Sequence, residues 1–239
     1  MNNKKIALSI NLLIILNPNI VNSYASYNAN TSKIELASLV VLTMMQPSVP
    51  VRESSELRPV PVVEAVDYLS FKPDLALRKQ FTQQFVERIQ EQNPVGAETL
   101  SSLQAQGDII ESIQTTLNAK GLTVTHLADA YVVWWVSMWQ AAQGKTTVLE
   151  RETAQAVKEQ ATKALLNTGV FKDANDSTKQ ELAETLLLQA LLLDAALEQV
   201  KSDPLLLEQL SESVINEAKQ SGLELDKMLL TPNGFVPTS

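Results

Sequence analysis

Residues 128–142 read ADAYVVWWVSMWQAA and hold all three tryptophans of this 239-residue chain. On a helix, at about 100° per residue, the aromatic and aliphatic side chains cover most of the circumference. The remaining polar side chains form one narrow stripe, made of His126, Asp129, Ser137 and Gln140. A helix that is apolar nearly all round lies in the middle of a bundle, whereas a membrane span needs about 20 apolar residues. We therefore predict a buried helix over about 124–143, with Thr123 as its N-cap and Gly144 just after its end.

A second buried helix is predicted over about residues 177–201. It contains TLLLQALLLDAAL at 185–197, whose leucines point in nearly every direction around a helix. Asp194 is the charged residue of that run. We expect it either to pair with a neighbouring helix or to reach solvent.

Helical periodicity extends through most of the remaining chain. Apolar residues recur at spacing four from Pro73 onward, at Leu77, Phe81, Phe85 and Ile89. Further helices are predicted over about 97–120, in one or two pieces, and over about 147–166 and 204–221. Thr147 and Glu150 have the spacing of a capping box, and Phe235 is expected to anchor a tail made of a short helical turn and an extended end. Only 7 glycines and 5% aromatic residues argue against a β-sandwich or barrel, so we predict an all-α bundle of about six helices over 64–239.

The first 25 residues have the layout of a secretory signal peptide. Lys4 and Lys5 precede the apolar run IALSINLLIIL at 6–16, and Ser23 and Ala25 are small residues at the −3 and −1 positions of a cleavage site. We expect cleavage after Ala25 and export to the periplasm or the cell exterior. No stable membrane span is expected after cleavage, because an apolar run this short cannot cross a bilayer.

Residues 26–63 are predicted to form an apolar and proline-rich arm. The segment 34–45, IELASLVVLTMM, is strongly apolar, and it is followed by Pro47, Pro50, Pro59 and Pro61. Proline fixes φ and removes a hydrogen-bond donor, so the proline-rich part is expected to be an extended linker. The apolar part either packs on the helical domain or binds a partner. Packing is favoured, because so apolar a segment is rarely left in water.

The charged residues exclude several classes of partner and cofactor. The formal charge is −8, and removing Lys4 and Lys5 makes it about −10, so the protein is acidic and should repel nucleic acid. The chain has no cysteine and one histidine. Metal sites built from Cys and His clusters are therefore excluded, and we expect no bound metal and no cofactor.

No catalytic residue is predicted. His126 falls in the first turn of the predicted tryptophan helix, where the positive helix end disfavours a charged imidazole, so we expect it to face solvent or cap the helix. Asp129 is expected mainly to interact with that same positive end. Glu98 and Glu111 are the carboxylates to consider for a glycan-cleaving enzyme, although their sequence surroundings are those of ordinary solvated helix faces.

Three segments resemble an uncharacterised family of exported bacterial all-helical proteins, classed as a domain of unknown function. They are GLTVTHLADAYVVWWVSMWQA at 121–141, ETLLLQALLLDAAL at 184–197 and LLTPNGFV at 229–236. The resemblance covers about 72–237 and supports the helical fold and the export. It implies no activity, cofactor or functional residue.

The tryptophan helix supplies the candidate binding site of the sequence. Aromatic residues at spacing four are expected to pack in the core, but they could instead line an apolar pocket between the two buried helices. The candidate ligand-binding residues are Asp129, Tyr131, Trp134, Trp135 and Trp139. We predict a non-enzymatic adaptor or inhibitor that binds another envelope protein. The alternatives are a carrier or sensor of a small apolar ligand and, third, a glutamate-dependent glycan-cleaving enzyme.

Overall fold

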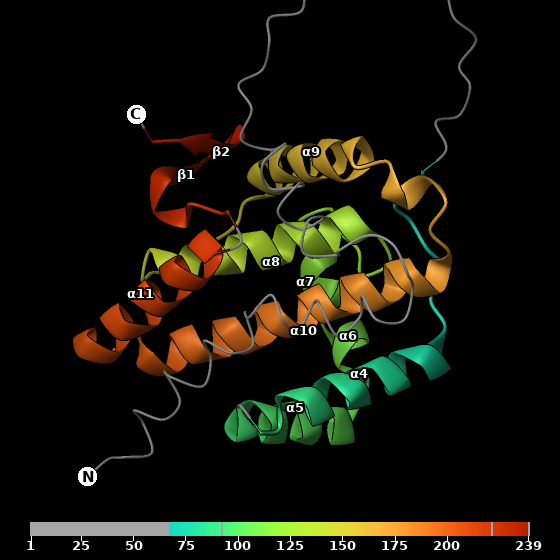
Figure 1. The fold of residues 1–239 in the computed structure, drawn as a ribbon, viewed down its shortest axis with the longest axis horizontal. Helices are drawn as coiled ribbons and strands as arrows, with labels where there is room; N and C mark the ends of the chain where they lie inside the picture. The colour runs from blue at the N-terminus through green and yellow to red at the C-terminus, as the bar shows by residue number, and fades with distance from the viewer. Residues whose placement is uncertain (1–66, 92, 221, 239) are drawn as a thin grey trace, which may run out of the picture.

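The computed structural model describes residues 67–91, 93–220 and 222–238, which form a compact helical body with one small two-stranded sheet (Figure 1). The elements in chain order are α4 Leu75–Ile89, α5 Pro94–Gln106, α6 Ile109–Ser112, α7 Gln114–Ala119, α8 Leu127–Ala142, α9 Arg151–Asn167, η1 Val170–Lys172, α10 Asp176–Val200, α11 Pro204–Gln220, η2 Leu225–Lys227, β1 Met228–Thr231 and β2 Gly234–Pro237. The prediction of an all-α fold is confirmed. The predicted signal peptide at 1–25 and the arm at 26–63 lie outside the described residues.

Helix α8 is the centre of the bundle. It packs against α9, α10 and α11, and Figure 1 shows it running between α9 and α10. All of its side chains are buried except those of Val133 and Trp134, which are partly exposed. Helix α10 likewise buries a long series of leucines against α8 and α4. Both predicted central helices are confirmed, because side chains that are apolar in every direction are satisfied only when helices surround them.

The start of α8 differs from the prediction. Its N-cap residue is His126, not Thr123. Val124 and Thr125 form a turn before the helix, and the extended His126 pairs with the first described segment. The pairing consists of an isolated bridge between Ser70 and His126 and of the bond from the Leu127 N–H to the Leu69 carbonyl (3.0 Å). This pairing delays the first helical turn by three residues.

The start of α9 also differs. The helix begins at Arg151 after Glu150, and no capping box forms at Thr147. The Thr147 carbonyl instead accepts a hydrogen bond of 2.7 Å from the side chain of Gln140 on α8. A contact with another helix therefore holds Thr147 in the loop.

Polar caps fix several other helix starts. Asp74 accepts from the N–H groups of Ala76 and Leu77 at the start of α4 (2.8 and 3.1 Å). Asn93 caps α5 and is followed by Pro94 at the first helical position, while Asp203 and Pro204 have the same arrangement in α11. Such caps satisfy the first backbone N–H groups of a helix, which have no partner within it.

The predicted helix over 97–120 is divided into α5, α6 and α7. The first break follows Gln106, where the chain leaves the helix at Gly107. Asp108 then starts α6 by accepting a hydrogen bond from the Glu111 N–H at 3.0 Å. The second break comes at Ile113, which ends α6 and precedes α7.

The C-terminal tail is a β-hairpin rather than an extended end. Strands β1 and β2 pair antiparallel in the register Met228↔Pro237, Leu229↔Val236, Leu230↔Phe235 and Thr231↔Gly234. The two-residue turn between them is Pro232-Asn233. Gly234 has φ of 91°, a left-handed conformation that favours glycine. The predicted anchor, Phe235, is buried in this hairpin at 6% exposure.

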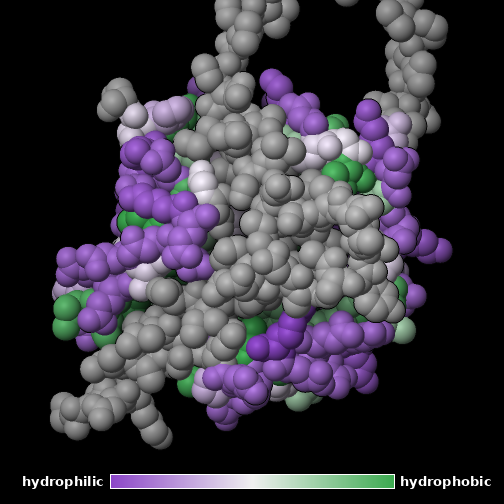
Figure 2. Space-filling model, in the orientation of Figure 1, coloured by the Kyte–Doolittle hydropathy of each residue, from purple (hydrophilic) through white to green (hydrophobic). Residues whose placement is uncertain are grey.

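The visible surface is mostly hydrophilic over α4, α5 and α11 (Figure 2). Five of the 19 basic and four of the 27 acidic residues lie in 1–66, so the described part of the chain carries 14 basic and 23 acidic side chains. The acidic surplus is therefore a property of the folded body. No helix among the described residues is long and apolar enough to cross a membrane.

Candidate functional site

The tryptophan side of α8 is covered by the C-terminal hairpin. The ring of Phe235 stacks on Trp135, with centroids 4.3 Å apart and an angle of 29° between the planes. The same ring meets Trp139 edge-on, at 6.1 Å and 66°. Stacked and edge-to-face aromatic pairs of this kind add about 0.5–1.5 kcal/mol beyond the burial of their area.

Polar side chains bind the main chain of the hairpin on both of its edges. Gln160 of α9 accepts from the Phe235 N–H and donates to the Phe235 carbonyl, both at 2.9 Å. On the β1 edge, the indole N–H of Trp139 donates to the Met228 carbonyl at 2.9 Å. A two-stranded sheet leaves backbone groups unpaired at its edges, and these two side chains supply the missing partners where the hairpin meets the helices.

The close approach of Gln160 explains the glycine beside Phe235. A Cβ atom placed on Gly234 would lie within 3 Å of the Gln160 amide, which is closer than real contacts allow. Gly234 is therefore required twice, by its positive φ of 91° and by the space that Gln160 occupies.

Trp135 and Trp139, two of the predicted ligand-binding residues, are thus in contact with the protein's own tail. Tyr131 and Trp134 lie further around the helix and meet each other edge-on at 5.3 Å. Tyr131 is 5% exposed, and its burial raises the pKa of its hydroxyl. The Tyr131 hydroxyl and the indole nitrogens of Trp134 and Trp135 are buried, and no acceptor in the described part of the chain bonds them.

Asp129, the fifth predicted site residue, is completely buried (0% exposed) on the other side of α8. Its carboxylate lies 2.7 Å from the Lys158 ammonium of α9 and accepts the Thr123 N–H at 2.9 Å. It therefore joins α9, the start of α8 and the loop before it. The structure separates Asp129 from the tryptophans, so the five predicted residues do not form one site.

His126 is buried at 8% exposure, so the expectation that it faces solvent is wrong, and its side chain makes no capping bond. Its Nδ1 is 3.5 Å from Asp129 Oδ1, and its Nε2 is 3.4 Å from Asp67 Oδ1. Burial lowers the pKa of His126, the Lys158 charge lowers it further, and the two carboxylates only partly oppose this. The pairing of residues 69–71 with residues 125–127 covers the ring, which sequence periodicity could not reveal.

A second buried charge cluster was not predicted. Arg78 of α4 is 3% exposed, and its guanidinium donates to Glu184 of α10 and to Asp108 before α6, both at 2.8 Å. Glu111 lies at 3.5 Å from the same guanidinium. Burial opposes the charge of Arg78, but the bonds to Asp108 and Glu184 outweigh it and raise its pKa. Burial raises the pKa of Glu184, and the contact with Arg78 works against that rise.

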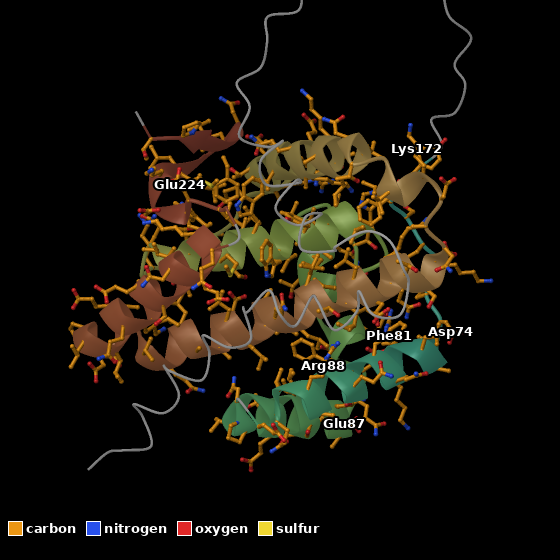
Figure 3. The ribbon with its side chains drawn as sticks, in the orientation of Figure 1. Asp74, Phe81, Glu87, Arg88, Lys172 and Glu224 are labelled. Carbon is orange, nitrogen blue, oxygen red and sulfur yellow. The ribbon has the colours of Figure 1, made fainter. Side chains whose placement is uncertain are left out.

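Gln180 extends this cluster to the start of α4. Its amide donates to Glu184 at 3.0 Å and to the Asp74 carbonyl at 2.8 Å, and it accepts the Asp74 N–H at 2.8 Å. Asp74 stands at the end of α4 in Figure 3. The cluster thus joins α4, α6 and α10 through Arg78 and the polar groups around it.

The buried face of α4 contained the signal for this cluster. The fully buried residues of the helix are Arg78, Thr82, Phe85 and Ile89, whereas Leu77 and Phe81 of the predicted stripe are partly exposed. Figure 3 shows Phe81 on the side of α4 toward α10. Arg78 continues the stripe of Thr82, Phe85 and Ile89 at helical spacing, and a charge in line with a buried face is unusual enough to suggest a buried partner.

The remaining sequence candidates are all exposed, and Glu111 meets the edge of the Arg78 cluster at 3.5 Å. Glu98 is exposed on α5, and Glu111 is exposed on α6. Asp194 of α10 is exposed, and its carboxylate also bonds the Ser137 hydroxyl of α8, so it both reaches solvent and contacts the neighbouring helix. Across residues 67–91, 93–220 and 222–238, no three His, Asp or Glu side chains are grouped to hold a metal ion.

A family model described as Family of unknown function (DUF6683) matches residues 21–238. The chain belongs to this family. The DUF6683 match confirms the resemblance and extends it, because it also covers the arm at 26–63 that the resemblance left out. Neither a curated protein nor a solved structure matches the sequence.

Proposed function

We propose that this DUF6683 chain is an exported, non-enzymatic protein that acts by binding another protein, as an adaptor or an inhibitor. The observation that carries the proposal is that aromatic and charged side chains in the interior contact other parts of the same chain. Phe235 covers Trp135 and Trp139, and the buried Arg78 and Asp129 are each paired with an opposite charge. Such an interior supports a stable fold and leaves the surface as the part that meets a partner.

The negative charge of the described chain favours a partner with basic groups. The described chain carries 23 acidic against 14 basic residues, and complementary charge speeds association and selects partners. On α11, Glu208 and Glu212 are both exposed, and no cation in the described part pairs with them. Like charges four residues apart destabilise a helix by about 0.2–0.5 kcal/mol, so a partner that neutralises them would relieve this repulsion.

Export rests on the first 25 residues of the sequence. The two lysines, the apolar run at 6–16 and the small residues before Ser26 support cleavage after Ala25. N-terminal sequencing of the protein from the envelope fraction tests this part. A start at Ser26 supports export, and a start at Met1 would contradict it.

Site-specific photo-cross-linking in producing cells tests the partner and its binding face. A photoreactive residue at Gln209, between the two glutamates of α11, is expected to give one cross-linked protein. Replacing Glu208 and Glu212 by lysine should abolish that product. The matched control replaces Glu87 near the end of α4 and Glu91 just after it, an exposed pair with the same spacing. Glu87 points away from α10 (Figure 3). This control should leave the product unchanged.

Deleting the arm at 26–63 distinguishes the two binding modes that the sequence raised. Loss of the product only on charge reversal assigns binding to α11, and loss only on deletion assigns it to the arm. If no variant changes the product, or if no product forms at any exposed position of the helices, the protein-binding function is wrong.

A second candidate function, the carriage of a small apolar ligand, is supported by one observation. The buried donors of Tyr131, Trp134 and Trp135 have no acceptor among the described residues, and an unsatisfied buried donor costs about 1–3 kcal/mol. A ligand with an apolar chain and a carboxylate or carbonyl would satisfy them. Palmitate titration followed by tryptophan fluorescence tests this: saturable binding that Trp134→Phe weakens about tenfold supports it, and no change in fluorescence contradicts it.

A further inference from the structure

We propose that Trp135, Trp139 and Gln160 form a peptide-binding site, and that the C-terminal tail of a second copy of this chain can fill it. The site is called the tail site below, and the tail is residues 228–238. In the structure the chain's own tail occupies the tail site. The proposal is independent of the envelope partner proposed above.

The tail site binds Phe235 in the way that a receptor binds an extended peptide. The aromatic side chain lies against two tryptophans, at centroid distances of 4.3 and 6.1 Å. The N–H and the carbonyl of the same residue bond one glutamine, each at 2.9 Å. Recognition of main-chain groups combined with a site for one side chain is the usual basis of peptide binding by strand-like contacts.

The specificity of the tail site follows from the same contacts. A side chain on the residue before Phe235 would displace the Gln160 amide from its two hydrogen bonds to Phe235, so a ligand with glycine before an aromatic residue fits best. Trp139 donates to the Met228 carbonyl across the hairpin, so a hairpin fits better than a single extended strand. The tail sequence, with Gly234 before Phe235, meets both conditions.

The tail is attached to the rest of the fold through buried side chains and side-chain hydrogen bonds rather than through a larger sheet. Its two strands of four residues pair only with each other, and an isolated two-stranded hairpin is marginally stable in water. Its other face is open, with Leu229 49% exposed. Its stability therefore depends on the tail site, and the chain before it contains Gly222, whose φ of 79° gives a point for a change of direction.

A second copy is the ligand whose chemistry fits the tail site fully. When two copies exchange tails, every contact of Phe235 and Met228 is replaced by an identical contact in the partner copy. The fraction of exchanged dimer then depends on the ratio of the protein concentration to the effective concentration of the attached tail. That effective concentration is of millimolar order for short connections. Exchange should therefore appear at high protein concentration.

Binding of a free tail peptide gives the first test. The full-length Phe235→Ala chain keeps the tail site and has a defective tail, so a labelled peptide of residues 226–238 should bind it at least tenfold more tightly than it binds wild type. Replacing the phenylalanine of the peptide by alanine, or adding Gln160→Ala to the chain, should weaken binding at least tenfold. Circular dichroism checks that each variant is folded.

Mixing two variants gives the second test and needs no peptide. The Phe235→Ala chain has an intact site, and the Gln160→Ala chain has an intact tail, so together they should form a heterodimer by native mass spectrometry at a few hundred micromolar. Each variant alone should form fewer dimers than the mixture. Any of three results would overturn the proposal. They are equal dimer fractions in all samples, equal binding of the peptides with and without the phenylalanine, and peptide binding without a heterodimer. Wild-type chains with two mass tags should also exchange tails, which covers the case in which Phe235→Ala does not fold.

Discussion

Gln160 of α9 bonds both main-chain polar groups of Phe235, with each of the two hydrogen bonds 2.9 Å long. One side chain thus fixes the strand that places an aromatic ring against Trp135 and Trp139. The residues that the sequence nominates as a ligand site are therefore divided among the tail contact, the Tyr131–Trp134 pair and the Asp129–Lys158 ion pair.

Phe235→Ala is expected to lower the free energy of unfolding by about 3–5 kcal/mol, because truncation of a buried aromatic side chain leaves a cavity between two tryptophans. Leu229→Ala, on the open face of the same hairpin, should change it by about 0.5 kcal/mol or less. Urea unfolding of both variants measures the difference. Equal effects of the two substitutions would show that the ring of Phe235 is not buried against α8.

Gly234→Ala should destabilise the protein more than Gly169→Ala. Both glycines have positive φ, 91° and 72°, so each substitution carries the strain of about 1–2 kcal/mol of a left-handed residue. Only at Gly234 would the new Cβ meet another group, the Gln160 amide, since nothing lies within 4 Å at Gly169. Thermal melts give the comparison. Adding Gln160→Ala to Gly234→Ala should recover part of the loss, and full additivity of the two changes would contradict the contact.

Arg78→Ala is expected to destabilise the fold by about 3–5 kcal/mol, because it leaves the buried Glu184 carboxylate without its cation. The double variant Arg78→Met with Glu184→Leu should be more stable than Arg78→Ala, since an apolar pair needs no charged partner. Lys201→Ala removes an exposed pair with Glu198 and should cost about 1 kcal/mol or less. Chemical denaturation of the three variants gives the ranking, and a small effect of Arg78→Ala would mean that the cluster is open to water.

Stability should fall as the pH drops through the titration of His126. The unfolded chain titrates this residue near the ordinary pKa of about 6.5, and burial lowers its pKa in the folded protein. Between those two values the unfolded state binds more protons, so the free energy of unfolding decreases with falling pH. The stabilisation is therefore complete above about pH 6.5 and is lost on the acid side of it.

The single histidine makes this titration easy to isolate. The imidazole proton signal in an NMR pH titration belongs to His126 alone, and its midpoint should lie below 6.5. The pH dependence of the stability of His126→Gln is subtracted from that of the wild type. The difference removes the contribution of the carboxylates and Lys158, and leaves that of His126. A midpoint above 6.5 would mean that the contacts with Asp67 and Asp129 outweigh burial.

The parts of the fold that sequence reasoning predicted are those set by local pattern. Helices α8 and α10 followed from runs such as VVWWV and LLLQALLL, in which apolar residues leave no polar face. The helix predicted over about 204–221 is α11, which begins at Pro204 after the capping residue Asp203. Each of these features depends on residues close together in the chain.

The parts that sequence reasoning missed depend on contacts between distant residues. Thr123 and Thr147 are good caps by type, but residues 69–71 and Gln140 hold their surroundings in extended and loop conformations. The partner of Arg78 is 106 residues away, and Gln160 is 75 residues before the strand that it bonds. The tail hairpin had a local sequence signal, the four residues TPNG between two short apolar runs. No local signal indicated that the hairpin packs against α8.

The contact between the rings of Phe235 and Trp135 is the central claim, because the tail site and the proposed surface function both rest on it. Nuclear Overhauser measurements on the full chain test it directly, since three tryptophans and five phenylalanines can be assigned by substitution. The structure predicts strong cross-peaks from the Phe235 ring to the indoles of Trp135 and Trp139, whose centroids lie 4.3 and 6.1 Å away. Cross-peaks to neither indole would contradict the account and reopen the tryptophan helix as a site for another ligand.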